Sequence, residues 1–376
     1  MSASTRFLGA IVRRGLDVAP RKLGNQEDVD RVVFTLSFAA FIIVIVLFVG
    51  CIIAIEYTYG MVVTTLTIIE DPNPEPVVSL PSYSDAVDDG HKAVIDKKQP
   101  LGLPEAEGLP ATYKPITSGF RSTIKHLRAR AGRGSRFRGF SHFLALSFAR
   151  GFLTNSLRFL GGFAPFVADI AVSTMVLAWV HAVISAPSSK SWYQRFPSVR
   201  KNWIKIAPAV ALSTLASQLS FHIPVAIGFM LGGFRLNENG IYVLAEASPV
   251  YHLYAAGAVV LSLILGLFLD VPAAVIMVRV AASLLPADDE TIVPFDRTFN
   301  GKVSPTEVDG SGAIGVLDAW RTLSWASYRR VVVAIVKVAG MLAATSFVFG
   351  IVGGLGVVLF AAGTPRSILT SLGIAA

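Results

Sequence analysis

Cysteine and charged residues are both scarce in this chain. Cys51 is the single cysteine, and charged residues make up 15% of the 376 residues, against about 25% in an average soluble domain. One cysteine excludes a disulfide framework and a cysteine-rich metal site within the chain. Because 53% of the residues are hydrophobic, the low charge predicts a membrane protein rather than a soluble domain.

The common sequence signatures of catalysis are also missing. The chain has no glycine-rich phosphate loop followed by Lys and Ser or Thr, no Gly-x-Ser-x-Gly turn and no His-Glu-x-x-His. His181 and His222 lie in neighbouring apolar stretches without a carboxylate pair at ligand spacing, which favours hydrogen-bonded histidines over a metal site. We therefore expect neither an enzyme nor a bound cofactor or metal.

Six apolar stretches are long enough to cross a bilayer as helices, which takes about 20 residues. The second of them contains Arg150 and Arg158, and each arginine is costly at a bilayer centre. It is therefore either a sixth span or an amphipathic helix on the membrane surface. The sequence predicts an all-α integral membrane protein, with spans near 32–56, 140–163, 164–186, 206–233, 252–280 and 331–362.

Loop charge favours the six-span alternative, with the helices arranged as three pairs. The formal net charge is +8, and the stretches 121–138 and 190–205 carry bases but no acid. If 140–163 crosses, both stretches fall on one side, as the positive-inside rule prefers. The loops at 57–139, 187–205 and 286–330 then share that side. We expect their partners to be the bilayer and its anionic lipid head groups, and not nucleic acid.

The regions outside the spans differ in composition. Residues 1–31 form a basic tail, which either flanks the first span or is an amphipathic targeting segment. Residues 70–118 form an acidic, proline-rich insert without apolar periodicity, which predicts disorder and a docking segment for a protein partner. The helical membrane domain then covers 119–376.

Two short elements that lead into even-numbered spans share a spacing. Before the second span stand Gly132, four residues, and then Phe137, Arg138 and Gly139. Before the sixth span stand Gly315, four residues, and then Trp320 and Arg321. Two odd-numbered spans also end alike, at Pro187 and Pro286, and proline is a natural helix stop.

Three helix pairs with these elements resemble the mitochondrial carrier (solute carrier) fold. That resemblance implies transport of a small solute and a mitochondrial membrane, with another endomembrane as the alternative location. In the carrier family, odd helices end in proline, any residue, an acid, two residues and a base. Pro286 and Asp288 match the start, but Thr291 stands at the base position, and Lys190 follows Pro187 without an intervening acid.

Two longer phrases carry a second resemblance. "WVHAVISAPSSKSWYQRFP" and "AASLLPADDETIVPFDRTFNG" are similar to uncharacterised fungal multi-pass membrane proteins, some of which carry the label "ubiquitin carrier protein". Ubiquitin conjugation needs a solvent-accessible thiolate. Because Cys51 lies in the first predicted span, we expect no such activity.

Ionisable groups inside spans are the candidate functional residues, because they are costly in lipid unless paired or hydrated. Asp270 and Arg279 lie too far apart on one helix to pair, so any partner of Asp270 must come from another helix, and Arg150, Arg158 and Lys337 are the candidates. Two functions remain open. One is a divergent carrier that moves a small anionic solute, and the other is a non-transporting membrane scaffold or interaction protein. The candidate cavity residues are Arg150, Arg158, Asp270, Arg279 and Lys337.

Overall fold

The computed structural model describes residues 26–71, 115–238, 242–244, 249–303 and 312–363. The chain divides into two compact units, one made of 1–61 with 333–376 and the other of 62–332. Most of the predicted tail at 1–31 and of the predicted insert at 70–118 lies outside the described residues.

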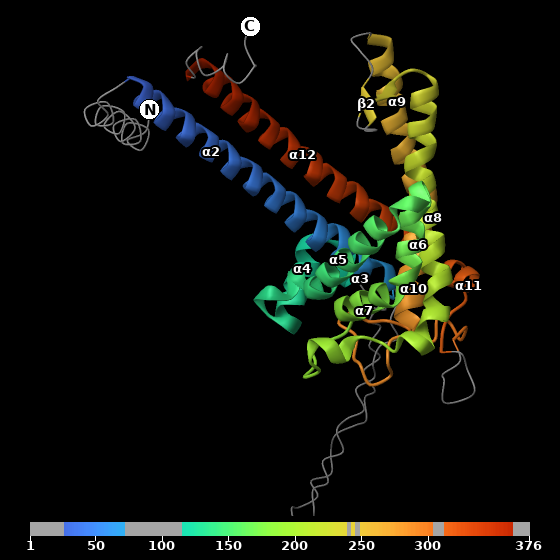
Figure 1. Ribbon diagram of the computed structural model, residues 1–376. Helices are drawn as coiled ribbons and strands as arrows, with labels where there is room; N and C mark the ends of the chain where they lie inside the picture. Colours follow the sequence, from blue (N-terminus) through green and yellow to red (C-terminus); the bar gives the residue numbers. More distant parts are fainter. Residues whose placement is uncertain (1–25, 72–114, 239–241, 245–248, 304–311, 364–376) are drawn as a thin grey trace, which may run out of the picture. The chain divides into compact units, whose positions relative to one another are not determined.

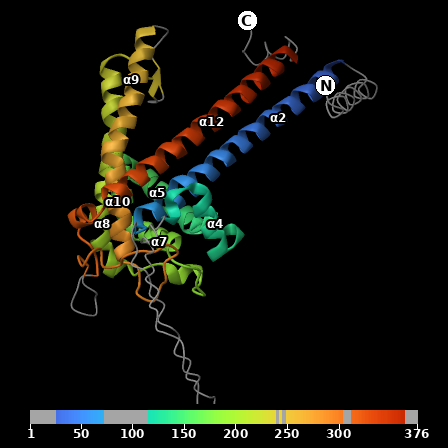
Figure 2. The ribbon, with the colours of Figure 1, turned by 180° about the vertical axis from the view of Figure 1, so that it is seen from behind.

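The first unit consists of long apolar helices. α2 (Gln26–Ile55) continues into a π-helical turn, Glu56–Val63, and α12 (Trp325–Gly363) contributes most of its length to this unit. α2 and α12 run side by side in both views (Figures 1 and 2), and the rings of Phe48 and Phe349 lie 5.3 Å apart. Their exposed side chains are mostly aliphatic or aromatic, as expected for helices surrounded by lipid.

The second unit holds the remaining elements, almost all of them helical. Short 3₁₀ turns lie at Ile116–Ser118, Arg133–Phe137, Arg158–Phe163 and Trp192–Arg195, and a π-helical turn lies at Gly266–Asp270. The strands β1 (Phe234–Leu236) and β2 (Tyr242–Leu244) form an antiparallel hairpin. The helices are α3 (Thr64–Ile69), α4 (Phe120–Ala131), α5 (Phe140–Ser156), α6 (Ala164–Ala171), α7 (Ser173–Ile184), α8 (Val199–Met230), α9 (Pro249–Leu265), α10 (Val271–Ser283) and α11 (Val316–Arg321).

α8 is the central helix of the second unit. It packs against α6, α7, α9 and α10, and its buried positions include Ile206, Ala209 and Val210. At Gly228 a Cβ atom would lie 2.7 Å from the Phe234 ring and 3.2 Å from Ala258 Cβ. Glycine at this position therefore allows the hairpin and α9 to approach α8 closely.

Among the described residues, four helical segments are long and apolar enough to cross a membrane, as a multi-pass integral membrane protein requires. They match the predicted spans near 32–56, 206–233, 252–280 and 331–362. The predicted span 164–186 corresponds to a pair of helices that meet at a bend of 55°, and counting this bent pair as one span gives five. The four segments are Thr35–Ile69, Val199–Met230, Pro249–Ser283 and Trp325–Gly356.

The span predicted at Phe140–Phe163, which is the second in chain order, is not one continuous helix. α5 ends at Ser156, and a 3₁₀ turn follows in which Gly161 has φ +58°. That turn reverses the chain into α6, because a residue in the left-handed region cannot continue a right-handed helix. The prediction of one span over 140–163 missed the glycine-containing reversal inside it.

α5, α6 and α7 together form a helical hairpin, residues 140–184. Its two ends meet, since a Cβ at Gly139 would lie 3.2 Å from Val183 and 3.4 Å from Trp179. Gly139 also has φ +69°, which disfavours any other residue. The hairpin therefore starts and ends at the same level, and the basic stretches before and after it leave from neighbouring points. The side of the membrane on which these stretches lie stays a prediction from loop charge.

Candidate functional site

Arg150 pairs with an aspartate of its own hairpin. Its Nε lies 2.6 Å from Asp169 Oδ1, and its Nη2 donates to Oδ2 at 2.9 Å. Thr214 on α8 donates a third hydrogen bond to Asp169 Oδ2 at 3.0 Å. The carboxylate side chain is 11% exposed and the Arg150 side chain 51% exposed. The pair neutralises both charges and attaches the hairpin to the middle of α8.

Asp270 has a neutral partner. Ser217 on α8 donates to Asp270 Oδ1, which is the hydrogen bond that the structure gives this carboxyl. Asp270 ends the π-helical turn, and Pro272 follows at the start of α10. In a π-helical turn residue 272 would donate to the carbonyl of Leu267, but proline has no N–H. The Tyr328 hydroxyl donates to that carbonyl instead, at 3.3 Å.

Arg279 joins α10 to α11. Its Nε donates to the Ala319 carbonyl at 2.9 Å, and its Nη2 donates to Thr322 Oγ1 at 2.8 Å. The guanidinium lies 4.8 Å from the centroid of the Phe299 ring. Arg279 is buried, so its donors hold the C-terminal end of α11 rather than face a solute.

The remaining predicted cavity residues are Arg158 and Lys337. Arg158 is exposed at the start of the turn between α5 and α6. Lys337 is exposed on the part of α12 that belongs to the first unit. The prediction that Arg150, Arg158 or Lys337 pairs with Asp270 is wrong for Arg150, which is engaged by Asp169. From the sequence alone, a serine of α8 could not be preferred to a distant base as the partner of Asp270.

The element before α5 has a structural role. Gly132 ends α4 with φ +78° and donates to the Arg128 carbonyl, and Phe137 is 43% exposed. Arg138 donates to the carbonyls of Ala182 and Val183, at 3.4 and 3.3 Å, and to that of Ser185. These carbonyls lie at the end of α7, where they have no helical donors. Arg138 therefore caps α7 and closes the hairpin.

The predicted echo of this element has another geometry. Gly315 stands before α11 with φ −68°, so it is not in the left-handed region, and Trp320 and Arg321 end that helix. Trp320 packs edge-on against Tyr328, with centroids 5.5 Å apart, and Arg321 is exposed. The shared spacing thus corresponds to a 3₁₀ turn in one place and an α-helix in the other.

The loops after α7 and α10 are bound to each other. α7 ends at Ile184, before Pro187, and α10 ends at Ser283, before Pro286. Ser185 and Thr291 form an antiparallel bridge, and Ile292 donates to the Ile184 carbonyl at 2.9 Å. His126 Nε2 on α4 lies 2.8 Å from the Ile292 carbonyl oxygen. We call residues 115–139, 185–195 and 286–302 together the loop platform.

Ion pairs reinforce the loop platform. Lys190 Nζ lies 2.8 Å from Asp288 Oδ2 and 2.7 Å from Asp289 Oδ1. The hydrogen bond from Lys190 lowers the pKa of Asp288, and the hydrogen bonds to Asp288 and Asp289 raise the pKa of Lys190. Arg297 donates to the carbonyls of Pro286 and Asp289. The Lys190 contacts join the loop after α7 to the loop after α10. The sequence predicts that both loops lie on the same side of the membrane.

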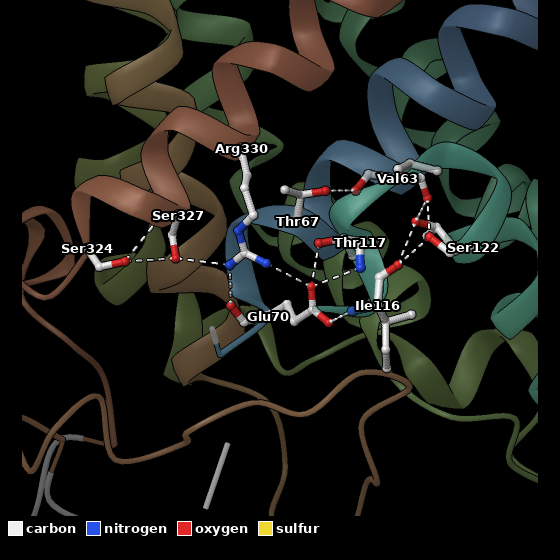
Figure 3. Close-up of polar contacts among 11 residues, drawn as sticks. Val63, Thr67, Glu70, Ile116, Thr117, Ser122, Ser324, Ser327 and Arg330 are labelled. Atoms are coloured by element: carbon white, nitrogen blue, oxygen red, sulfur yellow. Dashed lines mark hydrogen bonds and ion pairs between the residues drawn. The ribbon is translucent and has the colours of Figure 1, made fainter. Parts of the chain in front are cut away.

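Figure 3 shows a polar cluster that sequence reasoning missed. Glu70, at the end of α3, accepts from the Ile116 and Thr117 amides at 2.5 and 3.0 Å and from the Thr117 hydroxyl. Arg330 Nη1 lies 3.2 Å from Glu70 Oε2, and Arg330 Nη2 donates to Ser327 Oγ at 3.1 Å. We call these five residues the Glu70 cluster. The Glu70 side chain is fully buried.

The Glu70 cluster joins the two ends of the predicted insert. Glu70 directly precedes the proline-rich sequence, and Thr117 follows it. Glu70 and Thr117 were placed inside the predicted insert, 70–118, because composition alone sets no sharp boundary. A buried charge needs a partner. The signal in the sequence was therefore that Glu70 follows an apolar span directly, which indicates an acid that needs a partner. Its partner Arg330 lies 260 residues away and was not predictable.

The two histidines noted in the sequence make separate hydrogen bonds. His181 Nε2 lies 2.9 Å from the Ala281 carbonyl oxygen and is buried between α7 and α10. His222 Nε2 lies 2.8 Å from Gln218 Oε1 on the same helix. Among the residues that the structure describes, no three His, Cys, Asp or Glu side chains gather in a metal-binding arrangement.

Comparison with known proteins gives no relative. No family model, no curated protein and no solved structure matches the chain.

Proposed function

We propose that this chain is a non-transporting membrane scaffold that presents its loop platform and acidic insert at one membrane face. The observation that carries the proposal is how the loop platform is built. Side chains from α4, from the loop after α7 and from the loop after α10 are joined by hydrogen bonds and ion pairs. Loops of this length are expected to be mobile unless they have a role that needs fixed geometry.

The partners of three candidate solute residues support the same proposal. Arg279 holds α11, Arg150 is paired with Asp169, and Asp270 accepts from Ser217. A carrier needs charged side chains that converge on a water-filled space. The scaffold proposal includes no enzymatic activity, no cofactor and no ubiquitin conjugation, and Cys51 lies within the membrane-compatible segment Thr35–Ile69.

α4 supplies the membrane-facing chemistry of the scaffold. Four bases of α4 and one base just after it are exposed. The chain has no acid between Glu107 and Asp169. A cationic helix directly before a membrane hairpin attracts anionic head groups, each base contributing about 1 kcal/mol. The acidic insert, fastened at its base by the Glu70 cluster, is the proposed segment for a protein partner. The exposed bases are Arg121, Lys125, Arg128, Arg130 and Arg133.

A fluorescence experiment tests the lipid contact. Cys51→Ala removes the native thiol, and Ala129→Cys on the exposed face of α4 carries an environment-sensitive dye. The full chain is placed in nanodiscs of phosphatidylcholine with or without phosphatidylserine. Quenching by head-group spin labels should rise with phosphatidylserine. It should stay low in a matched variant with the four α4 bases Arg121, Lys125, Arg128 and Arg130 changed to Gln. Equal quenching in both lipids would contradict the proposal.

Transport of a small anionic solute is the second candidate, because the Arg150 side chain keeps half of its surface exposed. Uptake of a panel of small labelled anions into proteoliposomes separates the two functions. The scaffold predicts uptake equal to that of protein-free vesicles. Uptake above that level, lost both in Arg150→Ala and in the charge-balanced double variant Arg150→Ala with Asp169→Asn, would overturn the scaffold proposal. The double variant leaves no unpaired charge at Asp169, so its loss of uptake would be due to the missing guanidinium.

The compartment is part of the proposal. We propose a mitochondrial membrane, with another endomembrane as the alternative, since the basic residues 1–31 suit either a targeting segment or a membrane-flanking tail. A fluorescent C-terminal fusion, imaged with organelle markers, distinguishes the two.

A further inference from the structure

α4 packs by one face and exposes bases on the other. Thr123 and Leu127 are buried, and His126 Nε2 lies 2.8 Å from the Ile292 carbonyl oxygen. The exposed positions include four bases, and no ion pair among the described residues includes any of them. We call these four bases the basic face of α4: Arg121, Lys125, Arg128 and Arg130.

The bases of the basic face are close enough to repel one another. Arg121 and Lys125 are four residues apart, and Lys125 and Arg128 are three apart. Side chains at these spacings are neighbours on a helix surface, and like charges there are destabilising. α4 contains no acid that could compensate them, so a compensating anionic partner must come from another segment or from lipid.

Both ends of the segment 72–114, which lies outside the described residues, are fixed beside α4. The Glu70 carboxylate accepts from the Ile116 and Thr117 amides at 2.5 and 3.0 Å. The Ser122 hydroxyl, in the first turn of α4, lies 2.9 Å from the Ile116 carbonyl oxygen (Figure 3). The chain therefore enters and leaves this segment next to the start of α4.

The segment 72–114 carries the charge that the basic face lacks. It contains seven acids and four lysines, so its net charge is negative and α4 attracts it. The acids are Glu75, Asp85, Asp88, Asp89, Asp96, Glu105 and Glu107.

Chain length allows these acids to reach the basic face. Glu107 precedes Pro115 by eight residues, and eight residues span at most about 28 Å. α4 has 12 residues, which gives a length of about 18 Å. Because both ends of the segment are held beside α4, its acids stay at an effective concentration on the order of millimolar there.

We propose that the segment 72–114 docks on the basic face of α4, as an autoinhibitory contact that competes with anionic lipid head groups for the same four bases. The docking rests on charge and on the fixed ends of the segment, and its regulatory consequence rests on the proposed lipid contact of α4. Exposed ion pairs are individually weak, so the docking is reversible. Abundant anionic lipid, or a protein partner that binds the segment, releases the basic face to the membrane.

Zero-length cross-linking tests the docking. A water-soluble carbodiimide joins a lysine amine to a carboxylate that touches it, forming an amide while the carbodiimide takes up the water. Full-length protein in phosphatidylcholine nanodiscs is treated, and linked peptides are identified by mass spectrometry. We expect Lys125 to be linked to acids of 72–114 about fivefold more often than Lys201, an exposed lysine at the start of α8. Links from Lys125 should fall in about 0.5 M salt, which screens exposed charges.

Changing the charge of the segment tests its competition with lipid. The dye at Ala129→Cys, in the Cys51→Ala background, reports quenching by head-group spin labels in nanodiscs with a small fraction of phosphatidylserine. A neutral variant, in which five acids become amides, should raise quenching about threefold, because the basic face is then free for head groups. An acidic variant, in which three lysines become Gln, should lower it. The changed residues are Asp85, Asp88, Asp89, Glu105 and Glu107 in the neutral variant and Lys92, Lys97 and Lys98 in the acidic one.

The outcomes separate the docking from the lipid contact. Lys125 links no more frequent than Lys201 links would overturn the docking. Links found only between isotopically distinct copies would overturn it too, because the acids would then come from a second molecule. Frequent Lys125 links, with quenching that is independent of phosphatidylserine in every variant, would support the docking and contradict the lipid contact. Quenching that rises with phosphatidylserine equally in the neutral and acidic variants would overturn the autoinhibition.

Discussion

Removing the Glu70 carboxylate should detach the segment that follows the insert. In the Glu70 cluster, one fully buried carboxylate accepts from two backbone amides and a hydroxyl and pairs with Arg330, whose side chain is 18% exposed. Glu70→Ala leaves the guanidinium and both amides without this acceptor. Breaking a buried ion pair from one side costs about 3–5 kcal/mol, and that is the expected loss in the free energy of unfolding.

The isosteric variant separates charge from shape. Glu70→Gln keeps one acceptor oxygen and the side-chain volume, so it should lose only about 1–3 kcal/mol. Glu290→Ala is the matched control, because Glu290 is an exposed acid in the loop after α10, outside the segments that could cross a membrane. We expect the control to change stability by less than about 0.5 kcal/mol. Denaturant titration of the full chain in a mild detergent, followed by tryptophan fluorescence, gives the three values.

Local exchange distinguishes detachment from general destabilisation. Hydrogen exchange at the amides of Ile116 and Thr117 should accelerate in Glu70→Ala under conditions where the core of α8 stays protected. If the Glu70→Ala variant unfolded at the same denaturant concentration as the Glu290→Ala control, with those amides still protected, the cluster would not hold the insert. The reasoning from buried charge would then be refuted.

Three further outcomes follow from the same contacts. Replacing 72–114 by a flexible linker of about eight residues should preserve the fold and raise its unfolding free energy by about 1.5 kcal/mol through the shorter loop, measured by thermal unfolding. Arg150→Ala should destabilise by about 1–3 kcal/mol, and Asp169→Asn in the same chain should recover part of that loss, which a double-mutant cycle measures. The Lys190 ion pair should depend on pH. The pKa of Asp288 is lowered by Lys190 and the pKa of Lys190 is raised by Asp288, so the stabilisation from Asp288 is lost as the pH falls through its lowered pKa. The stabilisation from Lys190 is lost as the pH rises through its raised pKa, and hydrogen exchange of the loop after α7 reports both limits.

Composition was sufficient to find the membrane-crossing helices because that signal is local. A stretch of about 20 apolar residues is recognisable without knowledge of its neighbours, and 206–233 or 252–280 needed nothing more. Residues 140–163 show where this reasoning stops. Their composition suits a span, but the chain direction depends on one dihedral angle, at Gly161. Loop charge predicts one membrane side for the basic stretches before and after this hairpin, and the hairpin returns to the level at which it began.

The candidate site was less predictable because it depends on contacts between distant residues. Asp270 and Arg150 were singled out as costly charges, but their partners Ser217 and Asp169 follow from how the helices pack. Arg138 was noted for its spacing alone, and its task is to cap a helix that ends 46 residues later. A sequence shows which groups need partners, and the packing of the helices decides which partners they receive.

The polar positions of α8 explain how the second unit fixes its helix arrangement in lipid. Apolar contacts discriminate poorly between helices there, because lipid is as apolar as the side chains. Successive turns of α8 instead bond to three neighbours. Thr214 donates to Asp169 on α6, Ser217 donates to Asp270, and the Ser262 hydroxyl on α9 donates to the backbone carbonyl of Ser220 at 2.9 Å. Each such bond contributes only about 0.6 kcal/mol on average, yet a rotation of α8 by one residue would break all three together.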